Sequence, residues 1–163
     1  MAGHRGRSSS ADSAVDLVPP AASGLSPRLQ RVVDALPLEP GMRVLEIGGA
    51  PGAAARKVAA RVGPDGHVLV LDRSEAGIRR TQTNCREEVA SGLLSTMCAA
   101  VENFEIEPGT PLFDLAFACR VGALDGRHPR LYASALAHIS RAVIPGGMLY
   151  VDTESSLTPI ALD

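Results

Sequence analysis

Short apolar runs alternate with longer amphipathic segments from about residue 41 onward, and this alternation limits the possible fold more than any other feature. The apolar runs have the length of β-strands, and the segments between them have the spacing of helices with one apolar face. Strands joined through a helix can pair side by side only in parallel, because the chain must cross back before the next strand starts. The sequence therefore predicts an α/β fold, a Rossmann-like three-layer sandwich with a mostly parallel five-stranded sheet. The strands are expected at residues 43–47, 67–71, 93–100, 113–119 and 148–151.

Helix starts and a polar N-terminal segment complete the expected organisation. Ser26 and Pro27 are a typical N-cap and first helical residue, and this helix is expected to end before Pro37. Residues 1–24 are rich in Ser, Ala, Gly and Pro without periodicity, so we predict a flexible arm there and one domain over residues 25–163. Further helices are expected at residues 53–62, from Ser74 to about residue 90, and from Pro129.

The charge balance and the aromatic content argue against nucleic acid as a partner. The 163 residues carry 16 basic and 18 acidic side chains, which gives a net charge of −2. A nucleic-acid-binding surface needs an excess of Lys and Arg, and a base-stacking platform needs more rings than the two Tyr and three Phe present. We therefore expect a small-molecule partner and no nucleic acid.

The cysteine pattern and the hydropathy indicate the cytoplasm. Cys85, Cys98 and Cys119 are odd in number and form no CxxC pair, so we interpret them as buried, reduced thiols. No apolar run reaches the roughly 18 residues of a membrane helix, and residues 1–10 do not resemble a secretory signal. No HExxH motif or Cys/His cluster indicates a metal site. We expect a cytoplasmic protein with no membrane partner and no metal.

A glycine-rich turn, EIGGAPG at residues 46–52, follows the first predicted strand. In parallel sheets ligands bind beyond the carboxyl ends of the strands, and glycines let a ligand approach the bare backbone. The turn lacks the Lys and hydroxyl residue of the phosphate-binding loop, and Ala50 stands where the dinucleotide motif GxGxxG has its second glycine. ATP hydrolysis is thus disfavoured, NAD or FAD is weakly indicated, and a nucleoside with an amino-acid tail fits best.

Two acidic residues flank this turn at strand ends. Asp72 closes the second strand, 24 positions after Gly48, and a carboxylate there can accept hydrogen bonds from both ribose hydroxyls. Taken alone, Asp72 could instead cap the helix near Ser74 or pair with Arg73. Together with Glu46, which can attract a ligand ammonium group, it predicts a nucleoside site.

These residues resemble the class I S-adenosylmethionine-dependent methyltransferases. VLEIGGAPG (44–52) is similar to the glycine motif of that family, and VLVLDRS (68–74) to its ribose-binding strand end. FDLAFACR (113–120) is similar to the strand that borders the substrate, and IPGGMLYVD (144–152) to the turn into the fifth strand. Each motif alone is a weak signal, but the four occur in the family's order and span about residues 40–152.

The resemblance implies a role for each matching position. Glu46 would orient the methionine end of S-adenosylmethionine, Asp72 would hold the ribose, and the main chain of Cys119 would face the methionine. Val101 and Glu102 would lie beside the adenine. The implied cofactor-binding residues are Glu46, Gly48, Gly49, Gly52, Asp72, Arg73, Val101, Glu102, Ala118 and Cys119.

The sequence departs from the family's pattern in two places. Ala50 replaces the middle glycine and adds a methyl group where backbone and ligand come close. Only residues 153–163 follow the fifth strand, too few for the final helix and two-strand hairpin common in this fold. The fifth strand would then be an exposed edge. The last residues could fold back over that edge, or a second copy could pair there, and we predict a homodimer through it.

A polar cluster follows the fourth strand, where a methyl acceptor should enter: Arg120, Asp125, Arg127 and His128. Methyl transfer from a sulfonium needs the attacking atom, the methyl carbon and the sulfur in line, so most of what the protein supplies is positioning. His128 or Asp125 could accept the acceptor's proton near neutral pH, and these two are the predicted catalytic residues.

The sequence thus predicts an S-adenosylmethionine-dependent methyltransferase that modifies oxygen or nitrogen of a small molecule. The Asn-Pro-Pro-Tyr signature of enzymes acting on nucleic acids or protein glutamines does not occur, and abundant Ala, Gly, Arg and Pro weakly favour a role in specialised metabolism. Two alternatives stay open. One is a protein that binds the cofactor or its demethylated product without methyl transfer, as a cyclase or regulatory subunit, and the other is an NAD-dependent oxidoreductase.

Overall fold

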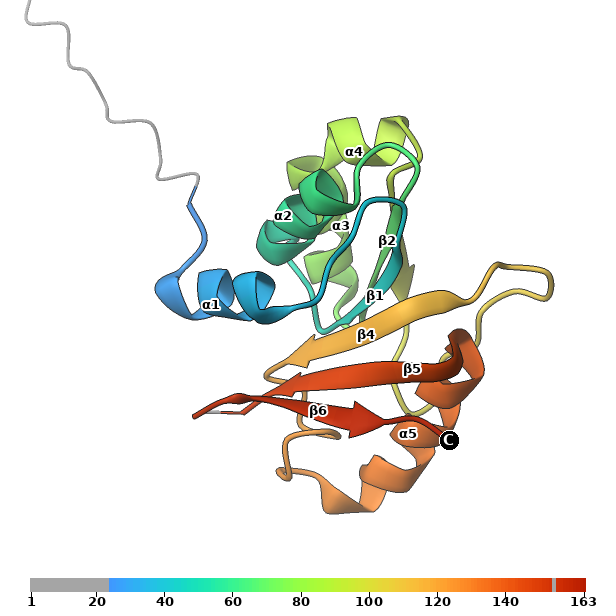
Figure 1. The fold of residues 1–163 in the computed structure, drawn as a ribbon. Coiled ribbons are helices and arrows are strands. Elements are labelled where there is room, and N and C mark those ends of the chain that lie inside the picture. The colour runs from blue at the N-terminus through green and yellow to red at the C-terminus, as the bar shows by residue number, and fades with distance from the viewer. Residues whose placement is uncertain (1–23, 154) are drawn as a thin grey trace, which may run out of the picture.

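The structure, a computed structural model that describes residues 24–153 and 155–163, is built on one six-stranded sheet (Figure 1). Its strands are β1 (Arg43–Ile47), β2 (His67–Asp72), β3 (Leu94–Cys98), β4 (Phe113–Cys119), β5 (Val143–Asp152) and β6 (Leu157–Ala161). The order is β3-β2-β1-β4-β5-β6, with β1 to β5 parallel and β6 antiparallel to β5. The predicted α/β fold with a mostly parallel sheet is confirmed. The arm predicted for residues 1–24 lies, apart from Gly24, outside the described residues.

The helices are α1 (Pro27–Ala35), α2 (Ala53–Val62), α3 (Glu75–Asn84), α4 (Arg86–Ala90) and α5 (Tyr132–Ala142), with a 3-10 turn at Pro129–Leu131 before α5. The predicted start of α1 is confirmed, since Ser26 Oγ accepts a hydrogen bond from the Leu29 amide. The single helix predicted up to about residue 90 is wrong, because the chain bends at Cys85, where φ is −110° and ψ is 27°. The bend turns the buried Cys85 thiol toward the Gly52 carbonyl, 3.6 Å away.

Alternate residues of the strands pack into two apolar layers, one on each face of the sheet. The first layer contains strand residues such as Val44, Val68 and Phe117, which pack against α1, α2 and the Cys85 bend. Leu45, Leu69 and other residues of opposite parity form the second layer, against α5 and the segments flanking it. Figure 1 shows α1, α2 and α3 on one side of the sheet and α5 on the other. The predicted three layers are thus present.

The last eleven residues contain a strand that the sequence analysis did not predict. Thr153 and Ser156 close a tight turn through a 2.9 Å backbone hydrogen bond, and β6 then pairs with β5 from Asp152↔Leu157 to Met148↔Ala161. Of the two expected outcomes for this segment, the structure takes the fold-back. The edge of β5 through which we predicted a homodimer is occupied by β6, so pairing of a second copy with β5 is wrong.

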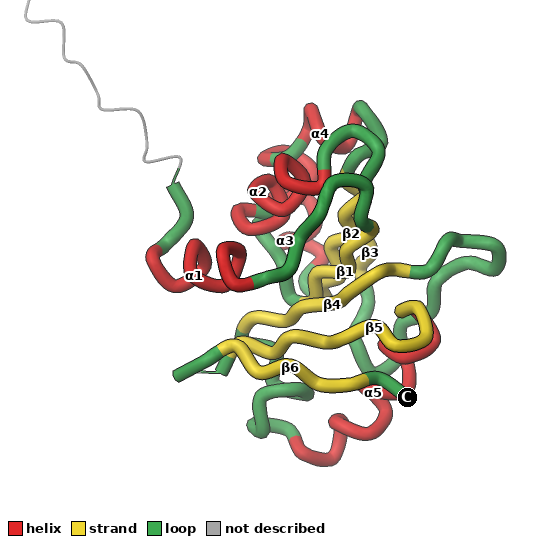
Figure 2. Tube along the Cα trace, in the orientation of Figure 1, coloured by secondary structure: helices red, strands yellow, loops and turns green. Residues whose placement is uncertain are grey.

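The sheet order reverses between β1 and β4, which are neighbours although β2 and β3 come between them in the chain. Such a reversal opens a crevice at the carboxyl ends of the strands. The connection from β3 to β4 is loop throughout, and the connection from β4 to α5 is loop up to the 3-10 turn (Figure 2). Within the described residues, no helix has both the length and the apolar character needed to cross a bilayer.

Candidate functional site

A cavity of about 220 Å³ lies at the carboxyl ends of β1, β2, β3 and β4. Its walls come from the last residues of β1 and β2 and from the loops that follow β1, β2, β3 and β4, so the sheet itself brings together segments that are far apart in the sequence. Six predicted site residues line it: Gly48, Asp72, Arg73, Val101, Glu102 and His128. The other six, Glu46, Gly49, Gly52, Ala118, Cys119 and Asp125, lie outside its walls.

Asp72 ties the glycine turn to the start of α3. Its Oδ2 accepts a hydrogen bond from the Ala50 amide at 3.1 Å, and its Oδ1 accepts one from the Ser74 amide at 2.9 Å. Ser74 itself caps α3, so Asp72 supports the residue that caps the helix and is not the cap. Its role toward a ribose stays a prediction, for which each oxygen still has a lone pair left. Since Asp72 also lines the cavity, those lone pairs are available to ligand hydroxyls.

Gly48 and Gly49 are required by close contacts within the turn. Gly48 has φ of +72°, and a Cβ there would lie 2.8 Å from Val121 Cγ2 on the opposite wall of the cavity. A Cβ at Gly49 would lie 2.6 Å from the Glu46 carboxyl carbon. Real Cβ atoms do not come this close to other atoms, so a side chain at either position would force the turn or the neighbouring Val121 or Glu46 side chain to shift.

Glu46 is buried at the end of β1, with 3% of its surface exposed. Its Oε2 has no hydrogen-bond partner among the described residues. Burial, and to a smaller extent the negative charge of Asp72, raises the pKa of Glu46 from its ordinary 4.5 to about 8. A carboxyl group that is buried, unpartnered and close to an open turn is a candidate partner for a cation.

Gly52 and Ala50 serve packing contacts on the side away from the cavity. Gly52, at φ +97°, caps α2, and a Cβ there would lie 2.7 Å from Cys85 Sγ and 3.0 Å from Thr81 Cγ2. The methyl group of Ala50 faces α3, where a Cβ at Gly77 would lie 2.8 Å from it. The methyl group thus packs against α3 and does not line the cavity, and the expectation that it comes close to a ligand stays a prediction.

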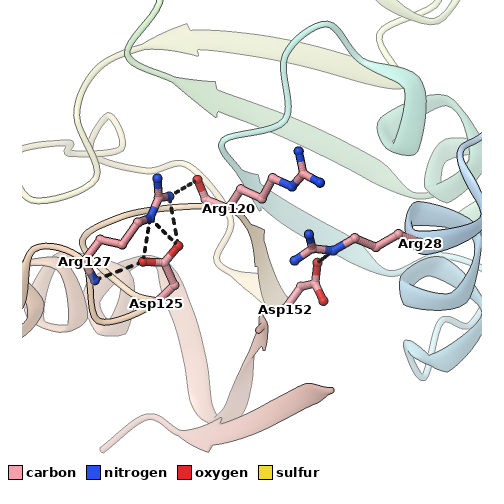
Figure 3. A network of polar contacts seen from close by, with 5 residues as sticks. All are labelled: Arg28, Arg120, Asp125, Arg127 and Asp152. Carbon is pink, nitrogen blue, oxygen red and sulfur yellow. Dashed lines mark hydrogen bonds and ion pairs between the residues drawn. The ribbon is translucent and has the colours of Figure 1, made fainter. Parts of the chain in front are cut away.

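The loop after β4 is held by Arg127 (Figure 3). Its guanidinium pairs with the Asp125 carboxylate at 2.9 Å and donates to the Arg120 carbonyl at 2.8 Å. The hydrogen bond from Arg127 keeps the pKa of Asp125 below its ordinary value, so Asp125 is a weaker base than we expected. His128 differs, because it lines the cavity and its ring packs directly on Gly122.

The cysteines are free, but only Cys85 is fully buried. Cys119 is half-buried, and burial, with smaller effects from the charges of Glu46 and Asp152, raises the pKa of its thiol to about 12. Such a thiol stays protonated at neutral pH, which agrees with a packing role for Cys119. Cys98 is exposed at the end of β3, so the expectation of three buried thiols is wrong for it. Among the described residues, no cluster of His, Cys, Asp or Glu could hold a metal ion.

An ion pair between Arg28 and Asp152 was missed by the sequence analysis. Arg28 lies on α1 and Asp152 at the end of β5, and Arg28 Nε is 2.8 Å from Asp152 Oδ2. In the sheet Asp152 is the register partner of Cys119. The two charged residues are 124 positions apart, so nothing in the sequence could have paired them.

Comparison with known proteins adds sequence relatives to this geometry. The family described as methyltransferase domain matches residues 44–147. The ubiquinone/menaquinone biosynthesis C-methyltransferase UbiE of Bordetella parapertussis is 35% identical over 115 residues, which are 70% of this chain and 41% of that protein. The chain thus spans about two fifths of the length of the curated relatives it matches.

Solved structures share the fold. A SAM dependent methyltransferase from Aquifex aeolicus superimposes with a TM-score of 0.61 at 17% identity, over 80% of this chain and 69% of that chain. The cyclase SpnF superimposes with a TM-score of 0.60 at 23% identity, over 76% of this chain and 42% of that chain. At identities this low, the superpositions show a shared architecture and no more. In this chain that architecture includes the crevice where the strand order reverses between β1 and β4.

Proposed function

Because this chain belongs to the methyltransferase domain family, we propose that it transfers a methyl group from S-adenosylmethionine to oxygen or nitrogen of a small molecule, in a specialised pathway. The observation that carries the proposal is the buried Glu46 carboxyl group beside the glycine turn, one oxygen of which has no partner in the part of the chain that the structure describes. A ligand ammonium group would supply the missing contact, and the cofactor has one on its methionine part.

The other described residues fit the rest of the cofactor. Asp72 would accept hydrogen bonds from the ribose hydroxyls, and Val101 and Glu102, which line the same cavity, would lie beside the adenine. Gly48 would let the methionine part pass close to the backbone, beside the main chain of Ala118 and Cys119. When bound, the cofactor supplies an electrophilic methyl group on a sulfonium.

The chain's own contribution to the chemistry is orientation and proton removal. The walls of the cavity would place the acceptor atom in line with the methyl carbon and the sulfur. As the new bond to the methyl group forms and the bond to sulfur breaks, the acceptor's proton would pass to the His128 imidazole, because that ring lines the cavity. Asp125 is left out of this role because it is engaged by Arg127.

Two measurements test the proposal. Calorimetry with S-adenosylhomocysteine should show binding, and incubation with methyl-labelled S-adenosylmethionine and a panel of phenols, alcohols and amines should yield labelled product. Binding without any product would favour the second candidate, cofactor binding without methyl transfer, which the shared fold with the cyclase SpnF supports. Label on carbon would match the C-methyltransferase relatives instead. Binding of NAD in place of S-adenosylhomocysteine would overturn the proposal.

His128→Gln is expected to lower kcat by about 10²-fold, the low end of the range for a lost general base, because methyl transfer depends mainly on positioning. Since no cofactor role is proposed for His128, the Kd of S-adenosylhomocysteine should stay unchanged. Asp125→Asn serves as the comparison and should lower kcat less, through the loop that Arg127 holds. An equal loss of kcat in both variants would argue against His128 as the base.

Ala50→Gly is expected to leave the Kd of S-adenosylhomocysteine within about threefold of the wild-type value, less than 1 kcal/mol. The reason is that its methyl group faces α3 and not the cavity. Gly77→Ala probes the same contact from the other side and should lower the free energy of unfolding by about 1–3 kcal/mol, as overpacking does. A large gain in affinity for Ala50→Gly would show that the methyl group does hinder the cofactor.

A further inference from the structure

A second polar cluster lies at the carboxyl ends of β4 and β5, beside the cavity (Figure 3). Asp152 has only 7% of its side chain exposed and is paired with Arg28 at 2.8 Å. Arg120 directly follows β4, and its side chain extends toward the guanidinium of Arg28. Both arginines lie near the Cys119 thiol. Their positive charges lower its pKa and so offset a small part of the rise caused by burial. The cluster therefore joins α1, β4 and β5 at one place.

The charges of this cluster do not balance. Asp152 supplies one negative charge, and Arg28 and Arg120 supply two positive ones. Arg28 uses only its Nε on Asp152, and within residues 24–153 and 155–163 neither its terminal amino groups nor the Arg120 guanidinium makes a hydrogen bond. Arg127 is different, because Asp125 neutralises it. Among the described residues of this cluster, one positive charge is left without a negative partner.

The backbone at Arg120 is held in an uncommon conformation. Its φ is +56°, the one positive φ found outside glycine in the described chain. A residue with a Cβ adopts this region at an energetic cost, so the surrounding structure must impose it. Here the Arg120 carbonyl accepts a hydrogen bond from Arg127 Nη2 at 2.8 Å. The turn sends the Arg120 side chain away from Arg127 and toward Arg28.

We propose that Arg120 and Arg28 bind an oxyanion of the methyl acceptor, a carboxylate or a phosphate, so that the acceptor is an anionic small molecule. This inference rests on the proposed function, since it names the substrate class of the same site. A guanidinium offers a planar fork of donors that matches either oxyanion, and the ion pair with Asp152 keeps Arg28 in place. Arg120 lines the same cavity as Gly48, so an anion bound to Arg120 would hold the rest of the acceptor near the proposed methionine site.

Three probes with the same phenol group test the inference: 4-hydroxybenzoate, 4-hydroxyphenyl phosphate and neutral 4-hydroxybenzamide. Their affinities are measured by calorimetry with and without saturating S-adenosylhomocysteine. We expect at least one anionic probe to bind about 10-fold or more tightly than the amide. Whichever anion binds better identifies the oxyanion as carboxylate or phosphate.

Arg120→Gln should remove this preference for the anion while the Kd of S-adenosylhomocysteine stays unchanged, and Arg120→Lys should keep part of it. Arg80→Gln is the matched control, because Arg80 is also an exposed arginine but lies on α3, and this variant should behave as the wild type. The inference is overturned if neither anion binds better than the amide, if the preference survives Arg120→Gln, or if that change weakens S-adenosylhomocysteine instead. Failure of the proposed function is distinct, because S-adenosylhomocysteine would then bind to no form of the protein.

Discussion

Glu46→Gln is expected to stabilise the free protein at pH 8 and, in the same variant, to weaken binding of S-adenosylhomocysteine. The two effects have one cause, the burial of a carboxyl group whose Oε2 has no partner within residues 24–153 and 155–163. At pH 8 and above the ionised carboxylate opposes folding. With the cofactor's ammonium group beside it, the same charge becomes an attraction.

The sign of the stability effect follows from the pKa of Glu46, which rises from 4.5 to about 8 on folding. Between these pH values the folded protein keeps a proton that the unfolded chain loses, so the free energy of unfolding falls as the pH rises. The loss is absent below pH 4.5 and reaches at most about 5 kcal/mol above pH 8. Glutamine does not ionise but leaves buried amide atoms to satisfy, so the net gain at pH 8 is about 2–4 kcal/mol.

Thermal unfolding at pH 5 and pH 8 measures this effect. The melting temperature of Glu46→Gln should exceed that of the wild type by about 5–10 °C at pH 8 and by little at pH 5. The Kd of S-adenosylhomocysteine should rise about 10- to 100-fold, the usual loss for one charged hydrogen bond. Glu105→Gln, at an exposed position, is the control for both measurements. If the gain in melting temperature over the wild type were no larger at pH 8 than at pH 5, the raised pKa of Glu46 would be contradicted.

Asp72→Ala is expected to raise the Kd of S-adenosylhomocysteine by about 10³-fold, because two charge-assisted hydrogen bonds to the ribose would be lost at once. The change also frees the Ala50 amide, so the glycine turn would lose one of its supports. Calorimetry gives the affinity, and thermal unfolding without ligand shows how much of the loss comes from the turn.

Two further variants separate these contributions. Asp72→Asn keeps an oxygen for one of the two amides and should lose less affinity than Asp72→Ala. Asp65→Asn changes an exposed acid in the turn before β2 and should bind as the wild type does. If Asp72→Ala binds S-adenosylhomocysteine normally, the ribose is not held by this carboxylate, and the proposed orientation of the cofactor is wrong.

The elements whose sequence signals are local could be predicted well. β1, α2 and β4 have the predicted bounds, because apolar alternation, glycines and caps act over a few residues. β6 was missed, since residues 157–161 become a strand by pairing with β5, which no local pattern shows. The bend at Cys85 was missed for a similar reason: it serves a contact with Gly52, 33 positions earlier.

The candidate site divides in the same way. Gly48, Asp72 and His128 could be singled out from the sequence because each occupies a recognisable position at a strand end, and the structure brings all three to one cavity. The packing roles of Ala50 and Gly52 could not be predicted from the sequence, because each residue faces a helix whose position depends on the whole fold.

By itself the sequence determined that β-strands and helices alternate, that the sheet is mostly parallel, and that a glycine turn between two acids lies at the ends of its first strands. The tertiary structure alone decided which charges meet. It buried Glu46 with its Oε2 unpartnered among the described residues, engaged Asp125 with Arg127, and joined Arg28 to Asp152. The physical reason is that hydrophobic periodicity and backbone preferences act between near neighbours, whereas burial and ion pairing depend on distances in space that only the folded chain defines.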